Sequence, residues 1–301
     1  MAIVETAAPA APDTYRRITI EPLTGALGAE VRGPEGRVDG GLGDRLDGRL
    51  DLASVDDETF AEIHRAFLDH KVLFFRNQPV TIEEHIAFGR RFGDLEVHPF
   101  ITNDATHPEV VILESTPDKP NAAEAWHSDV SFRAQPSLGS LLRGRIVPDV
   151  GGDTVWANME LAYEGLKDDV KEQIEGKVAV HSMEKVFGRS MSVEERAKAL
   201  EEYPRQRHPV VRTHPETGRR SIYVNKPFTL HIEDVDPEES RRLLDLLVAQ
   251  STVPQYQCRF RWRTDSFALW DNRCTQHYAV PDFFPSHRRM ERVTIIGDRP
   301  R

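Results

Sequence analysis

Two histidines and one aspartate are the residues of this 301-residue chain that best suit metal chemistry. His127 and Asp129 are separated by one residue, and His277 follows far downstream, after the run Trp-Asp-Asn-Arg at residues 270–273. Two imidazoles and one carboxylate on one face of a divalent metal leave the opposite coordination positions open, and non-haem Fe(II) oxygenases use this arrangement to bring a co-substrate and O₂ together. If the three side chains converge, the chain is an oxygen-activating enzyme.

The spacing of the first two candidates suits a β-strand. Successive side chains of a strand point to opposite faces, so residues i and i+2 share a face. A strand over residues 125–132 would direct His127 and Asp129 to the same side. The third ligand, His277, must then come from a distant strand that folds alongside.

The tripeptide alone is weak support for a metal site. The chain has twelve histidines, and a His-x-Asp sequence often arises by chance. The alternative is a histidine that bonds a neighbouring carboxylate or carbonyl and has only a structural role. The sequence that flanks the candidates therefore has to decide.

The composition is that of a globular protein with a sizeable core, 39% hydrophobic and 29% charged. A net charge of −10 argues against a nucleic-acid partner, because phosphate backbones require a basic face. A small anionic substrate remains compatible, since a few buried arginines can set the local field. No apolar run approaches the roughly 20 residues that cross a bilayer, so we expect no membrane partner.

Residues 1–14 are rich in Ala and Pro, contain Glu5 and lack the basic segment of a secretory signal. We expect a disordered tail there and a single domain over residues 15–301. The two cysteines, Cys258 and Cys274, are then expected to be reduced thiols in a cytoplasmic protein. A homo-oligomer is compatible with the sequence.

Short strands with inserted helices dominate the pattern, without regular βαβ alternation, which favours a β-sandwich or jelly roll. Residues 33–50, dense in Gly, Asp and Arg, predict an exposed loop. Helical spacing occurs at 56–70, 82–92 and 237–250, and the charged stretch 161–202 is helix-rich. Strands are predicted at 16–20, 27–31, 72–75, 110–113, 125–132, 138–146, 154–156, 210–212, 221–224, 258–262, 266–270 and 289–296.

From about Ile18 to its end, the chain resembles the taurine dioxygenase family of Fe(II)/2-oxoglutarate-dependent oxygenases. Several specific motifs occur in the family's order. The resemblance implies a double-stranded β-helix, a jelly-roll variant that is mainly β with inserted helices. The motifs are PLTGALGAE at 22–30, HKVLFFR at 70–76, WHSD at 126–129, GGDT at 151–154, HPVVRTHP at 208–215, the segment 270–278 and RRMERVT at 288–294.

The resemblance also implies roles for the residues that match these motifs. His127, Asp129 and His277 match the iron ligands. Arg288 matches the arginine that pairs with the distal carboxylate of 2-oxoglutarate, and Thr154 matches a threonine that hydrogen-bonds this co-substrate.

For the prime substrate, Arg292 matches an arginine that binds the anionic group, His98 a histidine that contacts a sulfonate, and Phe228 a pocket aromatic. Taurine-cleaving members carry a tyrosine where this chain has Ile101 and an asparagine where it has Ala123. Both departures make the pocket more apolar. We therefore expect an anionic substrate with a bulkier apolar part than taurine.

The two arginines also make sense from their spacing. Arg288 and Arg292 fall on one face of the last predicted strand, and the guanidinium fork suits carboxylate and sulfonate groups. The alternative is a solvated surface pair that makes salt bridges worth at most about 1 kcal/mol. Beside a metal motif, the two-anion interpretation is favoured.

The expected activity is hydroxylation of a C–H bond of a small anionic organic substrate, with Fe(II) as cofactor and 2-oxoglutarate and O₂ as co-substrates. Sulfonates, sulfate esters and aryloxyalkanoates are the expected substrates, and a product with a heteroatom leaving group would fragment to an aldehyde or ketone. A carboxylate or amino-acid-derived intermediate of secondary metabolism is the alternative. A metal-dependent hydrolase and a non-catalytic jelly-roll binding module are the alternatives of other classes.

Overall fold

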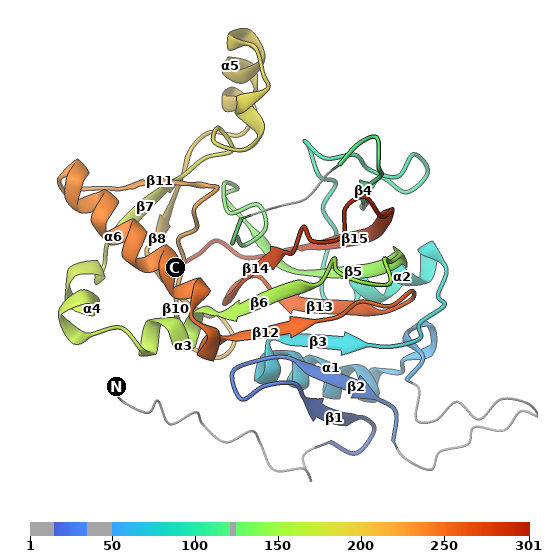
Figure 1. Cartoon of the computed structure of the whole chain (residues 1–301). Helices are drawn as coiled ribbons and strands as arrows, with labels where there is room; N and C mark the ends of the chain where they lie inside the picture. The colour runs from blue at the N-terminus through green and yellow to red at the C-terminus, as the bar shows by residue number, and fades with distance from the viewer. Residues whose placement is uncertain (1–14, 35–49, 121–124) are drawn as a thin grey trace, which may run out of the picture.

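The computed structural model describes residues 15–34, 50–120 and 125–301 (Figure 1). The predicted tail 1–14 and most of the predicted loop 33–50 lie outside the described residues. Among the helices of the described ranges, none has the length and apolarity that crossing a bilayer would require.

A seven-stranded sheet forms the main layer, in the order β1-β2-β3-β13-β5-β15-β4. Its neighbours pair antiparallel, except for the parallel pair β2 and β3. The sheet interleaves early and late strands, so its centre forms only when both ends of the chain are present. Its strands are β1 (Thr19–Pro22), β2 (Ala29–Arg32), β3 (Val72–Phe75), β4 (Val110–Ser115), β5 (Ser137–Ile146), β13 (Phe267–Asp271) and β15 (Arg288–Ile296).

A three-stranded antiparallel sheet, in the order β12-β6-β14, packs against the large one. It consists of β6 (Thr154–Asn158), β12 (Gln257–Phe260) and β14 (Thr275–Ala279). Aromatic rings fill the space between the sheets: Phe74 stacks on Phe260 with centroids 4.1 Å apart, and Trp156 lies 5.7 Å from Trp270. The two facing sheets confirm the predicted jelly roll.

Two helices cover the other face of the large sheet (Figure 1). They are α1 (Asp57–His70) and α2 (Ile82–Arg90), which confirms the helices predicted at 56–70 and 82–92. Asp56 caps the first turn of α1 by accepting the N–H of Thr59. Lys71, with φ of 65°, ends this helix and turns the chain directly into β3.

A second group of helices and short strands lies beside the two sheets and includes α6, which matches the helix predicted at 237–250. The helix-rich stretch 161–202 is confirmed, with β7 as an added strand. Figure 1 shows α5 projecting away from the other helices. The elements are α3 (Met159–Glu164), α4 (Asp168–Ile174), β7 (Val178–His181), α5 (Val193–Glu202), β8 (Gln206–Pro209), β9 (Val211–Thr213), β10 (Arg220–Ile222), β11 (Thr229–Ile232) and α6 (Pro237–Ala249), with single 3₁₀ turns at Leu52–Ser54, Phe187–Arg189, Gln250–Thr252 and Pro254–Tyr256.

The strand predicted over residues 125–132 is wrong. Only His127 forms a bridge there: its N–H and C=O exchange hydrogen bonds of 3.1 and 2.8 Å with those of His277. The chain then turns, with Val130 at a φ of 44°. The pairing ends because the next N–H, that of Asp129, bonds a side chain and not a second residue of a strand.

The packing of α6 generates a stability prediction from two adjacent leucines. Leu247 is fully buried in the core formed with α3 and α4, whereas Leu246 is half-buried at its edge. Leu247→Ala should lower the free energy of unfolding by about 2–5 kcal/mol, because it leaves a cavity. Leu246→Ala, the control, should cost clearly less. Chemical denaturation measures both, and equal costs would contradict the described orientation of α6.

Candidate active site

Three side chains from two distant segments of the chain converge at one point. Nε2 of His127 lies 3.8 Å from Oδ1 of Asp129, and Nε2 of His277 lies 3.9 Å from the same oxygen. The two imidazole centroids are 4.1 Å apart. His277 projects from β14, and its backbone bridge to His127 places the two rings side by side.

Both imidazoles are neutral and can offer a nitrogen lone pair. Burial lowers the pKa of His127 and lowers that of His277 strongly. Nδ1 of His127 lies 2.7 Å from the carbonyl oxygen of Ala125, which can only accept, so this nitrogen carries the proton. Its Nε2 is therefore the free lone pair, held in orientation by the Ala125 bond.

The carboxylate of Asp129 is ionised although it is buried. Burial by itself would raise the pKa, but the charge of the Arg292 guanidinium and the hydrogen bond from Ser140 hold it below its ordinary value. Nη1 of Arg292 donates to Oδ1 at 2.7 Å, and Oγ of Ser140 donates to Oδ2 at 2.8 Å.

Two neutral nitrogens and one anionic oxygen form the donor set of a facial metal site. The three ligand atoms all lie within 4.8 Å of one another. Atoms that each bind one ion at about 2.1 Å are separated by roughly 3–4 Å, so a small closure of the three side chains would bring them to bonding distance. These residues can hold a divalent metal ion.

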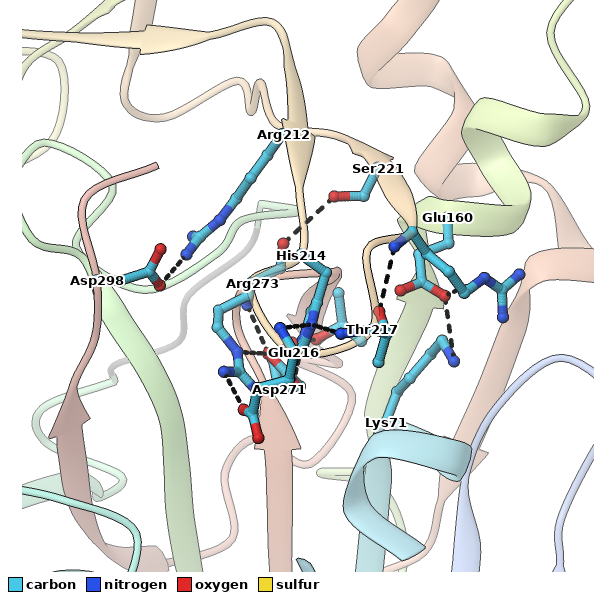
Figure 2. Close-up of polar contacts among 12 residues, drawn as sticks. Lys71, Glu160, Arg212, His214, Glu216, Thr217, Ser221, Asp271, Arg273 and Asp298 are labelled. Carbon is cyan, nitrogen blue, oxygen red and sulfur yellow. Dashed lines mark hydrogen bonds and ion pairs between the residues drawn. The ribbon is translucent and has the colours of Figure 1, made fainter. Parts of the chain in front are cut away.

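A second cluster of similar residue types, His214, Asp271 and Cys274, is not a metal site. Figure 2 shows His214, Asp271 and Arg273 gathered in one polar network. Nδ1 of His214 accepts two backbone N–H groups, so its Nε2 carries the proton and donates to Asp271 at 3.0 Å. Arg273 binds both oxygens of Asp271, and burial raises the pKa of the Cys274 thiol well above its usual value. All three potential donors are protonated or engaged.

A cavity of about 1820 Å³ opens over the first cluster. Among the predicted site residues, His98, Ile101, Thr154, Phe228, Arg288 and Arg292 line it together with His127, Asp129 and His277. The structure therefore brings all nine into one space.

Arg288 is a buried cation at the wall of this cavity. Burial lowers its pKa to about 10, with the Asp153 charge opposing, so it is charged at neutral pH. Within the described part of the chain, its Nε has no hydrogen-bond partner. Gly152 gives it room: with φ of +72°, a Cβ there would lie 3.1 Å from Cδ and Nε of Arg288. A buried, largely unpaired guanidinium calls for an anion.

Thr154 begins β6 at the same wall. Its Oγ1 accepts the indole N–H of Trp262 at 2.9 Å, which leaves the hydroxyl proton available as a donor. The side chain is buried, so a polar group that enters the cavity beside it would be hydrogen-bonded without competition from bulk water.

His98 offers a second kind of donor. Its Nδ1 accepts the backbone N–H groups of Phe100 and Ile101, each at 3.2 Å, so Nε2 carries the ring proton. Burial lowers the pKa of His98 to about 3, with Arg292 acting in the same direction. The ring is a neutral N–H donor at the cavity.

The apolar wall of the cavity surrounds the predicted aromatic Phe228 with further side chains, of which Phe100 was not predicted from the motifs. Phe100 stacks on Phe187 with centroids 4.8 Å apart, and Phe187 lies 6.3 Å from Phe228. Val130 lines the same wall. These residues come from four separate segments, so no sequence periodicity could join them. Residue 123, the other predicted departure, lies outside the described residues.

Comparisons with known proteins show the family to which the chain belongs. The family model described as "Taurine catabolism dioxygenase TauD, TfdA family" matches residues 19–294. An alkylsulfatase of Acinetobacter baylyi is 37% identical over 94% of this chain and 86% of its own. An alpha-ketoglutarate-dependent sulfate ester dioxygenase of Pseudomonas putida is 32% identical over 94% and 91%.

Among solved structures, a taurine dioxygenase from Burkholderia xenovorans superposes with a TM-score of 0.77 at 34% identity, over 95% of this chain and 91% of that one. The superposition covers nearly the whole chain, and it confirms the fold that the resemblance implied. The chain belongs to the taurine catabolism dioxygenase TauD, TfdA family and is a 2-oxoglutarate-dependent dioxygenase.

Proposed function

We propose that this enzyme uses Fe(II), 2-oxoglutarate and O₂ to hydroxylate a C–H bond of a small anionic organic substrate, and that sulfate esters are its leading substrate class. One observation carries the proposal: the His127, Asp129 and His277 cluster opens on a cavity that also contains two buried guanidinium groups. The names of the two relatives above support a sulfate ester.

In the proposed site, the two neutral imidazoles and Oδ1 of Asp129 hold the metal from one side. Bound Fe(II) would couple the oxidative decarboxylation of 2-oxoglutarate to succinate and CO₂ with transfer of one oxygen atom of O₂ to the substrate. The role of the protein would be to position 2-oxoglutarate and the substrate beside the metal and to exclude bulk water.

The co-substrate is assigned to the wall formed by Arg288 and Thr154. A buried fork of N–H donors suits the distal carboxylate, and the free proton of Thr154 provides a further hydrogen bond. The guanidinium of Arg288 feels the Asp153 charge but has no hydrogen-bonded carboxylate partner in the described ranges, which favours binding of the dianion.

The prime substrate is assigned to a second part of the cavity wall. Arg292 and the N–H of His98 would bind its anionic group, while Ile101, Phe228 and Phe187 would contact its apolar part. Hydroxylation of the carbon that carries the ester oxygen gives a hemiacetal-type sulfate. This intermediate collapses: the bond between the hydroxylated carbon and the ester oxygen breaks, the hydroxyl group loses its proton, and an aldehyde and inorganic sulfate are released.

The rival classes make different demands. A hydrolase would release an alcohol and sulfate without consuming 2-oxoglutarate, and a binding module needs no buried, unpaired arginine beside a metal cluster. We propose a cytoplasmic protein without a nucleic-acid or membrane partner, in keeping with the free thiols of Cys258 and Cys274 and the net charge of −10. A homo-oligomer remains part of this proposal.

The first prediction concerns the metal set. Anaerobic addition of Fe(II) and 2-oxoglutarate to the wild-type protein should produce a weak visible charge-transfer band, and substrate should then stimulate succinate release in air. His127→Ala should abolish both. His85→Ala is the control, because His85 is a buried histidine that bonds the carbonyl of Leu141 and does not line the cavity. Near-normal succinate release by His127→Ala would remove His127 from the metal set.

The second prediction separates the two arginines. Arg288→Ala should raise the KM for 2-oxoglutarate, and Arg292→Ala chiefly the KM for the sulfate ester, each by about 10- to 100-fold, the equivalent of a lost charged hydrogen bond of about 1.5–3 kcal/mol. Each variant is the control for the other. Steady-state kinetics with either ligand varied measure the split, and a reversed or shared pattern would contradict the assignment.

The third prediction concerns chain length. Among straight-chain alkyl sulfates, each added methylene that reaches the aromatic wall should raise kcat/KM by about fourfold, equivalent to about 0.8 kcal/mol per buried methylene. Sulfonates, aryloxyalkanoates, carboxylates and taurine form the comparison panel in the succinate-release assay. Ile101→Tyr should lower the preference for longer chains because it fills this wall. A preference for taurine in the wild-type protein would overturn the proposed class.

A further inference from the structure

We propose that Asn272 and Ser140 are positioning residues that select which oxygen of Asp129 binds the metal. The inference rests on the proposed function, since it concerns the metal held by His127, Asp129 and His277. Neither residue belongs to the set that the motifs predict for metal, co-substrate or substrate.

Asn272 uses all of its hydrogen-bonding capacity around Asp129. Its Oδ1 accepts the backbone N–H of Asp129 at 3.1 Å and the indole N–H of Trp270 at 3.0 Å. Its Nδ2 donates to Oδ2 of Asp129 at 3.3 Å and to Oγ of Ser140 at 3.2 Å. One buried amide therefore fixes both the backbone and the side chain of the ligand residue.

The two carboxylate oxygens of Asp129 differ as a result. Oδ2 accepts from Ser140 at 2.8 Å and from Asn272 at 3.3 Å, which commits it to the protein. Oδ1 faces the Nε2 atoms of His127 and His277 and accepts a single hydrogen bond, from Nη1 of Arg292 at 2.7 Å, so one of its two lone pairs remains free. Asp129 is thus held to present one oxygen. A carboxylate that bound through both oxygens would occupy a further coordination position, one that 2-oxoglutarate and O₂ need.

The position of Asn272 is fixed in turn by the hydrogen bonds of its neighbours in the chain. Its neighbours Asp271 and Arg273 belong to the network of Figure 2, where Arg273 binds both oxygens of Asp271 and also Oε1 of Glu216. The hydroxyl of Thr275 closes the turn by donating to the carbonyl oxygen of Asp271. The turn between β13 and β14 therefore cannot rotate Asn272 away without breaking buried charge pairs.

The test is Mn(II) affinity of the metal-free enzyme, measured by the electron paramagnetic resonance signal of free Mn(II). Asn272→Ala should raise the Kd for Mn(II) by about 10- to 100-fold, the usual effect of removing a group that orients a metal ligand. Asn158→Ala is the matched control. Asn158 is equally buried and makes side-chain hydrogen bonds, to Ala26 and the start of α3, outside the metal cluster. Both variants should lower Tm, but the control should change the Kd by less than twofold.

Ser140→Ala provides a second, milder variant that decides the matter should Asn272→Ala fail to fold. It deletes the other donor to Oδ2 and should raise the Kd for Mn(II) in the same direction. An unchanged Kd in Ser140→Ala or in a folded Asn272→Ala, or an equal rise in Asn158→Ala, would overturn the positioning role alone. Wild-type protein that fails to bind Mn(II) would overturn the proposed function with it.

Discussion

The site depends on one reciprocal backbone contact, the pair of hydrogen bonds that His127 and His277 exchange. The two residues come from distant parts of the chain, and a hydrogen-bonded antiparallel pair places opposite Cα atoms about 5.5 Å apart with side chains on one face. The two imidazoles are therefore neighbours by backbone geometry, before any metal contributes. β14 also pairs with β6, and this pairing fixes the position of His277 along the sheet. The bridge to His277 then fixes the position of His127.

The charged groups of the site are one carboxylate, Asp129, and two guanidinium groups, Arg288 and Arg292. Asp129 is a buried anion whose nearest cation is Arg292, and the imidazoles stay neutral because burial disfavours their protonated forms. Arg292 has five N–H donors, of which Nη1 bonds Asp129 while Nε has no partner in the described ranges. The same guanidinium can therefore hold the metal ligand in its ionised form and still face an anion in the cavity, whereas Arg288 can serve only a ligand.

Much of the fold was predictable because its signals are local. The caps and apolar spacing of α1 and α2, the buried run of β3 and the alternation of β12 appear in contiguous residues. The strand over 125–132 failed because the pattern could not show that the side chain of Asn272 takes the N–H of Asp129. The prediction that the side chains of His127 and Asp129 face the same site was nevertheless right. The resemblance implied Phe228, but the packing of Phe100 and Phe187 beside it could not be predicted, since the three rings meet only in the folded protein.

Two clusters of similar residue types differ in their ability to bind a metal ion, and the difference lies in the hydrogen bonds that their side chains make. In the His214 and Asp271 cluster, backbone N–H groups take the imidazole lone pair and Arg273 takes both carboxylate oxygens, so nothing remains for an ion. In the His127 cluster, a carbonyl takes the imidazole proton, so the lone pair of the other ring nitrogen stays free. Two donors bind Oδ2 of Asp129 but only Arg292 binds Oδ1, so one lone pair of Oδ1 also remains for an ion. Residue identity supplies the donors, and the surrounding hydrogen bonds determine whether they are available to a metal.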